Sequence, residues 1–327
     1  MTRGRNDGMD VGMTGSRTAG TGAKGAAPDT PTVMIDGVTF THPDKVLWPE
    51  QGLTKRDLVA YYNKMADRIL PHVAGRPVTL LRCPSGRQAQ CFVQRHAGEG
   101  VPPAVKRIAL REPKGAVEYL TVDDRRGLLA MVQMGVLELH PWGARGDRPD
   151  RPDRVVLDLD PADTVPWAAV VEAAQGLRRI FAEVGFESFA MVTGGRGIHV
   201  TVPMARRLDW DQTQAFAKAV ATRYADTDPK RFTVSPLKTA RIGRIFIDPM
   251  RNARGSSSVA PYSPRAREGA TVATPVGWDE LATLAGPAAF TVQTVPERVR
   301  TLQSDPWAQV LVLQQTLTAA AKKTLGL

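Results

Sequence analysis

The chain has 327 residues, of which 43% are hydrophobic, and a formal net charge of +10. This length and apolar fraction are enough for one large domain or two smaller ones, each with a real core. No apolar run reaches the roughly 20 residues that a membrane helix needs, and the N-terminus has no signal-peptide core, so we expect a soluble, intracellular protein.

The N-terminal third predicts a tail followed by a mixed α/β segment. Residues 1 to about 31 are rich in Gly, Thr, Ala and Ser without a hydrophobic period, which is typical of a disordered tail. Thr54 and Asp57 form a capping box ahead of apolar residues at helical spacing, so we expect a helix from about 55 to 70. Short strands are predicted at 78–81 and 90–94, and an apolar helix over 125–139 leading to His140.

The two cysteines, Cys83 and Cys91, lie close together in the chain. No second pair is present to complete a zinc site, and an intracellular protein keeps its thiols reduced. We therefore expect two reduced cysteines and no structural zinc.

Residues 143–154 alternate arginine with aspartate around prolines, which indicates a surface connection. It divides the domain predicted for residues 32–300 into an N-terminal portion, 32–142, and a second portion, 154–300. Residues 301–327 are predicted to form a helical tail, with a helix over 307–325.

The sequence of the second portion predicts six elements in this order: strand 154–160, helix 166–184, strands 187–193 and 198–203, helix 210–225 and strand 244–248. A hairpin after the first crossover helix makes the sheet mostly antiparallel, an α+β fold of the RNA-recognition type.

Two aspartates, Asp158 and Asp160, close the buried strand Arg154-Val-Val-Leu-Asp-Leu-Asp-Pro161. Positions i and i+2 of a strand point to the same face, so the two carboxylates emerge side by side. Two like charges held this close favour a divalent cation such as Mg²⁺, which also binds substrate phosphates. An Asp-x-Asp alone is equally typical of strand-end turns and of sugar-nucleotide transferases.

Two further motifs follow. Thr193-Gly-Gly-Arg-Gly-Ile-His199 joins two strands through glycines, which let backbone N–H groups approach a phosphate, although an ordinary hairpin with a core histidine has the same pattern. Arg244-Ile-Phe-Ile-Asp248 is a third strand that ends in a carboxylate. No Walker motif or Gly-x-Gly-x-x-Gly fingerprint occurs, which excludes the common ATPases and dehydrogenases.

Positive charge is concentrated between Pro229 and Arg267, a stretch that contains nine basic residues and one acidic residue, Asp248. Such a run is often only a solvated face. Here it holds most of the excess charge of the chain and encloses Gly255-Ser-Ser-Ser258, so we expect it to bind a nucleotide or nucleic acid.

The order Asp-Leu-Asp-Pro, Thr-Gly-Gly-Arg-Gly-Ile-His and Phe-Ile-Asp resembles the three motifs of the archaeo-eukaryotic primase superfamily. From about Val38 to Pro296 the chain resembles more closely the polymerase domain of bacterial ligase D, which acts in non-homologous end joining. Other motifs support this: Asp44-Lys-Val-Leu-Trp-Pro49, Ala74-Gly-Arg-Pro77, Glu138-Leu-His140 and Val259-Ala-Pro-Tyr-Ser263.

The resemblance implies a primase-polymerase fold and a template-directed repair polymerase that fills short gaps or extends broken ends and favours ribonucleotides. Asp158, Asp160 and Asp248 match catalytic acids that hold two divalent ions, Mn²⁺ or Mg²⁺. The implied nucleotide-binding residues are His140, Thr193, Gly195, Arg196, His199, Lys238 and Arg241. The implied DNA contacts are Lys45 and Lys55 at the 5′-phosphate of a gap, Phe92 on the template base, and Arg82, Arg251 and Arg265.

The resemblance also implies partners and a location: gapped or broken DNA, NTP or dNTP, and the candidates Ku and a DNA ligase, for a cytoplasmic, nucleoid-associated monomer. Three positions depart from the family pattern. Thr193 replaces serine, Arg196 replaces lysine, and Val93 replaces a second aromatic beside Phe92. No Lys-x-Asp-Gly ligase motif is found, so a stand-alone enzyme and an excised domain both stay open.

Other function classes compete with the polymerase. A metal-dependent nuclease or an Asp-x-Asp glycosyltransferase explains the acids but not the whole set of motifs. A catalytically weak module that binds DNA ends or gaps explains the basic run but not the retention of all three acids.

Overall fold

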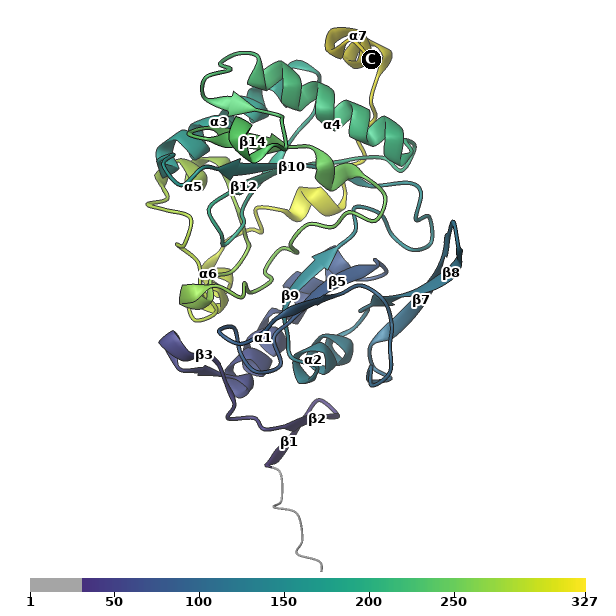
Figure 1. Cartoon of the computed structure of the whole chain (residues 1–327), viewed down its shortest axis with the longest axis vertical. Helices are drawn as coiled ribbons and strands as arrows, with labels where there is room; N and C mark the ends of the chain where they lie inside the picture. The colour runs from purple at the N-terminus through teal and green to yellow at the C-terminus, as the bar shows by residue number, and fades with distance from the viewer. Residues whose placement is uncertain (1–30) are drawn as a thin grey trace, which may run out of the picture.

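The computed structural model describes residues 31–327, so nearly all of the tail predicted for 1–31 lies outside the described residues. The chain forms two sheet-containing halves, stacked one above the other in Figure 1. One continuous hydrophobic cluster contains buried residues from both halves, from Val38 to Ala321. Within the described residues no helix is long and apolar enough to cross a membrane.

The upper half in Figure 1 is built on a six-stranded sheet of order β13-β14-β10-β12-β11-β15. Its strands are β10 (Arg154–Pro161), β11 (Phe189–Val192), β12 (Ile198–Pro203), β13 (Phe232–Thr233), β14 (Ile245–Asp248) and β15 (Thr274–Val276). Helices α3 (Trp167–Glu183) and α4 (Trp210–Ala225) cover one face. The units β10-α3-β11-β12-α4-β14 give the antiparallel β14-β10-β12-β11 arrangement of an RNA-recognition fold, so the predicted α+β class is confirmed.

The lower half contains a five-stranded antiparallel sheet of order β6-β5-β8-β7, in which β9 also pairs with β5. These strands are β5 (Val78–Arg82), β6 (Phe92–Gln94), β7 (Lys106–Glu112), β8 (Gly115–Thr121) and β9 (Val136–Pro141). Helices α1 (Lys55–Val73) and α2 (Arg125–Gln133) lie against it, and the short ladders β1 (Thr32–Ile35) with β2 (Val38–Thr41) and β3 (Val46–Trp48) with β4 (Leu53–Thr54) precede them. The predicted capping box is present, since Thr54 Oγ1 accepts from Asp57 N–H and Asp57 accepts from Thr54 N–H.

The predicted helix over 125–139 is wrong in its second half. The helix ends at Gln133, and residues 136–141 form β9, which carries His140. Gly135 has a φ of +78°, and a Cβ there would lie 2.8 Å from Pro84 Cα. The chain can turn from helix to strand here because glycine alone tolerates both conditions.

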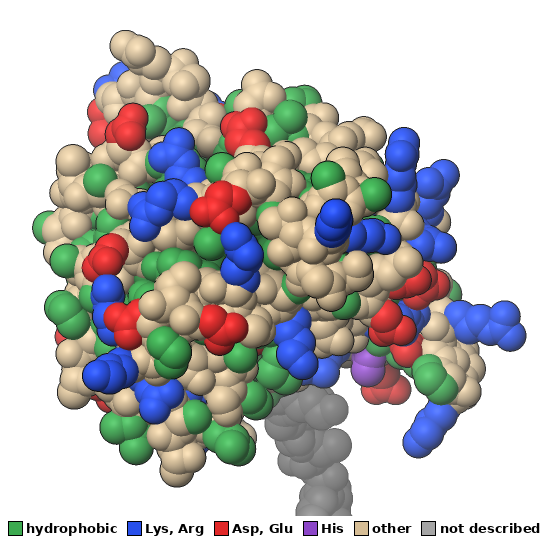
Figure 2. Space-filling view, turned by 90° about the horizontal axis from the view of Figure 1, so that it is seen from above, with side chains coloured by type: hydrophobic (Ala, Val, Ile, Leu, Met, Phe, Trp, Pro, Cys, Tyr) green, Lys and Arg blue, Asp and Glu red, His purple; other side chains and the backbone are tan. Residues whose placement is uncertain are grey.

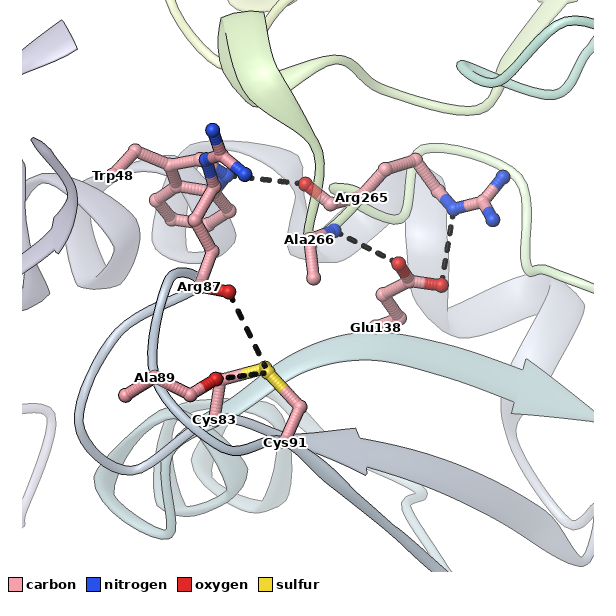
Figure 3. The surroundings of a disulfide bond; sticks show 8 residues. All are labelled: Trp48, Cys83, Arg87, Ala89, Cys91, Glu138, Arg265 and Ala266. Atoms are coloured by element: carbon pink, nitrogen blue, oxygen red, sulfur yellow. Dashed lines mark hydrogen bonds and ion pairs between the residues drawn. A yellow bond between two sulfur atoms is a disulfide. The ribbon is translucent and has the colours of Figure 1, made fainter. Parts of the chain in front are cut away.

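The prediction of two reduced cysteines is also wrong, because Cys83 and Cys91 form a disulfide (Figure 3). Cys83 directly follows β5 and Cys91 directly precedes β6. Antiparallel pairing of these two strands brings their ends together, so the sulfur atoms meet at the closure of the 84–90 loop. Counting cysteines could not reveal this proximity.

The predicted helix over 307–325 is interrupted. A short 3-10 turn spans Ala308–Leu311, and α7 spans Ala319–Leu325. Between them the chain is held alongside the end of β12, where Ala205 N–H donates to Gln315 O and the Gln315 amide donates to Pro203 O. The other helices are α5 (Trp278–Thr283) and α6 (Val295–Thr301).

Figure 2 views the molecule from above, over α3, α4 and α7. On this face Lys and Arg side chains are interspersed with Asp and Glu and do not form one basic patch.

Candidate active site

The three predicted acids lie together on the face of the upper sheet that α3 and α4 leave open. Asp158 on β10 is directly opposite Asp248 on β14, and Asp160 follows two residues later. Leu157 and Leu159 are fully buried in the main core, so the alternation of the strand turns the aspartates to the other face. All three acids line a pocket of about 350 Å³.

Two arginines pair with the three carboxylates. Arg251 Nη2 lies 3.0 Å from Asp158 Oδ2, and its Nε lies 3.5 Å from Asp248 Oδ2. Arg241 Nη1 lies 3.3 Å from Asp160 Oδ2, while the Arg241 guanidinium stacks 3.7 Å from the Phe246 ring centroid. Arg251, predicted to contact DNA, is thus placed at the acids themselves.

The electrostatics of the three acids differ. Burial opposes ionisation of Asp158, but His199 and Arg251 outweigh it and hold the pKa of Asp158 well below its ordinary value. Burial and the Asp158 charge raise the pKa of Asp160. Burial first, and Asp158 to a lesser extent, raise the pKa of Asp248. The cluster is therefore short of positive charge, which is the condition that a bound cation relieves.

The glycine-rich turn between β11 and β12 forms one wall of the pocket. Gly194 has a φ of +66°, and a Cβ on Gly197 would lie 2.3 Å from Leu159 O, so the turn presses against the strand that carries the acids. His199 Nε2 comes within 3.6 Å of Asp158 Oδ1. Thr193 Oγ1 donates to Gly197 O and accepts from Gly195 N–H, so its hydroxyl already holds the turn.

Two predicted nucleotide-binding residues are placed less centrally. Arg196 lines the pocket and also forms an ion pair with Asp163. Lys238 does not line the pocket; it is exposed on the same 3-10 turn as Arg241, Lys238–Arg241. The structure thus brings together all the predicted catalytic and nucleotide-binding residues except Lys238.

Glu138 lies beside the pocket in the motif Glu138-Leu-His140, which does not itself indicate a role for it. Its buried carboxylate accepts from Arg265 Nε at 3.0 Å and from Ala266 N–H at 2.8 Å, as Figure 3 shows, and lies 2.8 Å from His140 Nε2. Arg265 Nη1 also donates to Thr193 O. Burial would raise the pKa of Glu138, but His140 and Arg265 lower it to about 2. Arg265, predicted to bind DNA, therefore belongs to the pocket.

One sequence signal could identify Glu138. A carboxylate two residues before a histidine on the same strand points to the same face. The helix predicted over 125–139 conceals that signal, because it places the two residues on different faces. Arg267, Phe246 and Ser258 also line the pocket. They lie within the predicted basic stretch and the Phe-Ile-Asp motif, but the sequence assigns none of them an individual role.

Five of the nine basic residues predicted to form a polyanion-binding stretch make ion pairs. Arg241, Arg251 and Arg265 do so inside the pocket, while Arg231 pairs with Glu172, and Arg254 pairs with Glu112 and Asp150. Part of the stretch thus contributes charge to the pocket, while Lys230 and Lys238 are exposed outside it, and binding of a polyanion by the stretch stays a prediction.

The residues present fit divalent cations. Three carboxylates on neighbouring strands offer the hard oxygen donors that Mg²⁺ and Mn²⁺ prefer. As the side chains stand, however, no group of three or more His, Cys, Asp or Glu residues within 31–327 is placed to hold a metal ion. Arg251 pairs with Asp158 and Asp248, so an ion at the three acids would have to displace it and would take further ligands from water or from substrate phosphates.

The predicted 5′-phosphate residues lie in the lower half, across the β3–β4 ladder. Lys55 N–H donates to Lys45 O, which places the two residues side by side. Lys45 is exposed, whereas Lys55 is only 7% exposed and its Nζ donates to Thr41 O and to Gln133 Oε1. Burial, with a smaller contribution from Lys45, lowers the pKa of Lys55. Lys45 is the more accessible of the two charges.

The predicted template contact is on β6. Phe92 is 44% exposed and Val93 is 59% exposed. The Arg82 guanidinium lies 5.0 Å from the Phe92 ring centroid, and Arg82 donates to Met134 O and Gln94 Oε1. These bonds fix Arg82 as a support beneath an exposed aromatic ring.

Comparisons with known proteins show which proteins the chain is similar to. The family model described as "LigD, primase-polymerase domain" matches residues 54–307. The chain is 36% identical over 319 residues to the multifunctional non-homologous end joining protein LigD of Pseudomonas aeruginosa, covering 96% of this chain and 38% of that protein. It is 30% identical over 264 residues to the bifunctional LigD of Bacillus subtilis, covering 80% and 42%. The chain thus spans well under half the length of these relatives.

A solved structure is similar as well. The polymerase domain of Mycobacterium tuberculosis ligase D, in complex with DNA, superposes with a TM-score of 0.79 at 31% identity, covering 85% of this chain and 99% of that one. The similarity extends over both halves of the fold.

Proposed function

The chain belongs to the LigD primase-polymerase domain family, which confirms the resemblance inferred from its motifs, and we propose that it is a DNA-directed nucleotidyltransferase that fills short gaps or extends broken ends in DNA repair. One observation carries the proposal. Three strand-borne acids, the glycine-rich turn and the arginines of the basic stretch, which are far apart in sequence, line one pocket. A nuclease or a glycosyltransferase would need the acids but not this combination.

The acids and the cationic side chains have complementary tasks. Asp158, Asp160 and Asp248 would hold two divalent ions, which in polymerases of this type activate the attacking hydroxyl and stabilise the leaving group. The Arg241 guanidinium, fixed over Phe246, and His199 would bind triphosphate oxygens. Backbone N–H groups of the 193–199 turn other than that of Gly195, which donates to Thr193 Oγ1, would add further donors. Electrostatic complementarity to the developing phosphate charge is the main catalytic contribution of these residues.

Arg251 must change partners for this chemistry. Its guanidinium pairs with both Asp158 and Asp248, where cations would bind. This ion pairing favours a second candidate function, a catalytically weak module that binds DNA ends or gaps. The two functions differ in whether a bound nucleotide and metal displace Arg251.

The DNA would contact the lower half. Phe92 is an exposed aromatic supported by Arg82, and stacking on such a ring tolerates any base. Lys45 is an exposed point charge suited to the 5′-phosphate on the far side of a gap, with Lys55 beside it. We further propose that the chain acts as a monomer with Ku and a DNA ligase, at the nucleoid.

The sugar site favours ribonucleotides in this proposal. Thr193 keeps one acceptor lone pair after its two bonds within the turn, and His140 is fixed by Glu138 nearby. A site that hydrogen-bonds a hydroxyl penalises a substrate that lacks it.

A primer-extension assay tests the proposal. The chain should extend a primer across a short gap with Mn²⁺, copying the template base and releasing pyrophosphate, and should use ribonucleotides at least as well as deoxynucleotides. DNA binding without any extension would support the weak binding module instead. Template-independent products or nucleotide-sugar turnover would contradict the polymerase proposal.

A further inference from the structure

A second cavity, of about 560 Å³, lies at the other end of β10 from the acids. Arg154 begins β10, whereas Asp158 is four residues further on, about 13 Å along a strand. The two cavities share no lining residue. The charged residues that line the second cavity are Arg76, Arg145, Arg148, Arg154, Arg206, Arg207, Asp147 and Asp153.

The inner part of this cavity holds more positive charge than its acids neutralise. The Asp153 carboxylate accepts hydrogen bonds from both Nη atoms of Arg76, at 2.8 and 2.5 Å. Arg154 Nε lies 3.3 Å and Arg145 Nε 3.6 Å from the same carboxylate. One carboxylate therefore serves three guanidinium groups. The Arg76 and Arg154 side chains are only 2% and 8% exposed, so water screens their charges weakly.

Two donors in this cluster have no partner. Arg76 Nε and Arg206 Nε are buried and make no hydrogen bond among the described residues. Arg206 uses its two Nη atoms on Asp147, at 2.7 and 2.8 Å, which leaves Nε unused. A buried donor without an acceptor is costly, and an anion bound in the cavity could supply the missing acceptors.

Repulsion among the arginines adds to the effect of burial and lowers their pKa values. Burial first, then Arg76, lowers the pKa of Arg154 to about 10, and burial with Arg76 lowers the pKa of Arg145. Burial and the same three arginines lower the pKa of the neighbouring His72 to about 3, so no further proton is accepted there. An added anion would relieve this repulsion.

Apolar side chains line part of the cavity. They are Met204, Val310, Leu311 and Leu313, of which Met204 and Val310 are buried and Leu311 is 45% exposed. The volume lies within the range of about 300–1,000 Å³ that is usual for small-molecule sites. An arginine cluster beside apolar side chains suits a ligand that has phosphate at one end and an apolar ring at the other.

We propose that this cavity is a second anion site, separate from the catalytic pocket, that binds the phosphates of a small molecule, either free pyrophosphate or the phosphate tail of a nucleotide. Its buried arginines provide the charge, and its volume of about 560 Å³ suits a small molecule. The polymerase proposal does not depend on it.

Calorimetric titration of the full chain in EDTA tests this, with pyrophosphate, ATP and a 5′-phosphorylated oligonucleotide as probes. The variant Arg145→Gln/Arg206→Gln removes two charges from the cavity without changing the buried Arg76 or Arg154. Arg223→Gln/Arg300→Gln removes the same charge from distant surface pairs. Arg241→Gln reports the contribution of the catalytic pocket.

We expect pyrophosphate and ATP affinity at the second site to fall at least about tenfold in the cavity variant and to be unchanged in the surface variant, with binding retained in Arg241→Gln. Tighter binding of ATP than of pyrophosphate would identify a nucleotide. Arg207→Gln, at an exposed position, should weaken binding in the same direction even if the double variant is unstable. Unchanged affinity in both cavity variants, loss of all binding in Arg241→Gln, or an effect on the oligonucleotide alone would overturn the proposal.

Discussion

Replacing Glu138 by Gln is expected to destabilise the fold and to disorganise the pocket together. The pKa of Glu138 falls from 4.5 to about 2 on folding, because the bonds from His140 and Arg265 outweigh its burial. This difference corresponds to about 3 kcal/mol at pH 7, since one pKa unit is ~1.4 kcal/mol. The variant also leaves Arg265 without its ion-pair partner, so a loss of about 3 kcal/mol in unfolding free energy is expected.

The pH dependence has a definite sign. A carboxyl whose pKa is depressed by folding stabilises the native state fully above its unfolded pKa, near 4.5, and loses that contribution as the pH falls towards about 2. Urea unfolding of the wild type and of Glu138→Gln should therefore differ most at neutral pH and converge below pH 4.5. Extension activity should fall as well, because Glu138 orients His140 and Arg265.

The matched control is Glu118→Gln. Glu118 pairs with Arg107 on the surface and is 56% exposed, so its removal should cost under about 1 kcal/mol. If Glu138→Gln is no more destabilising than this control at pH 7, the reasoning about the buried carboxylate is wrong.

Three other variants test the proposed contacts. Lys45→Ala should reduce extension on gaps with a 5′-phosphate about tenfold and change extension on open primer-templates little. Lys64→Ala is the control and should affect neither substrate. Equal loss on both substrates would make Lys45 a general contact to the DNA backbone. Phe92→Ala should weaken template binding by about 1–3 kcal/mol in a gel-shift assay, and unchanged affinity would exclude stacking. Thr193→Val should lower the ribose preference, measured as the ratio of kcat/KM for a ribonucleotide to that for the matched deoxynucleotide, whereas Thr193→Ser should retain it. An unchanged ratio in Thr193→Val would show that Thr193 does not act in the sugar site.

The upper half is well predicted from sequence because its elements are locally encoded. The Asp158 and Asp248 strands are marked by apolar runs, and the turn between β11 and β12 is marked by its glycines. The hairpin after the first helix implies antiparallel pairing. Since strand alternation alone places Asp158 and Asp160 on one face, these two acids can be grouped from their spacing in the chain.

The lower half is less predictable because its pairings are non-local. The apolar run 125–139 satisfies a helix and a buried strand equally, and only contact with β5 makes residues 136–141 a strand. The Cys83–Cys91 disulfide likewise depends on the pairing of β5 with β6. The position of Arg251 between Asp158 and Asp248 depends on the tertiary fold and has no local signal.

Asp158 is assigned to the chemistry of nucleotide transfer and not to DNA affinity, and the other roles in the pocket depend on this assignment. The most direct measurement compares wild type, Asp158→Asn and the surface control Asp67→Asn, which is 84% exposed, in gapped-DNA extension with Mn²⁺ and in gel-shift affinity on the same DNA. We predict that Asp158→Asn loses extension at least about a thousandfold while binding DNA within about twofold of wild type, and that Asp67→Asn behaves as wild type in both assays. Extension by Asp158→Asn at the wild-type rate would contradict the assignment of this pocket as the catalytic site.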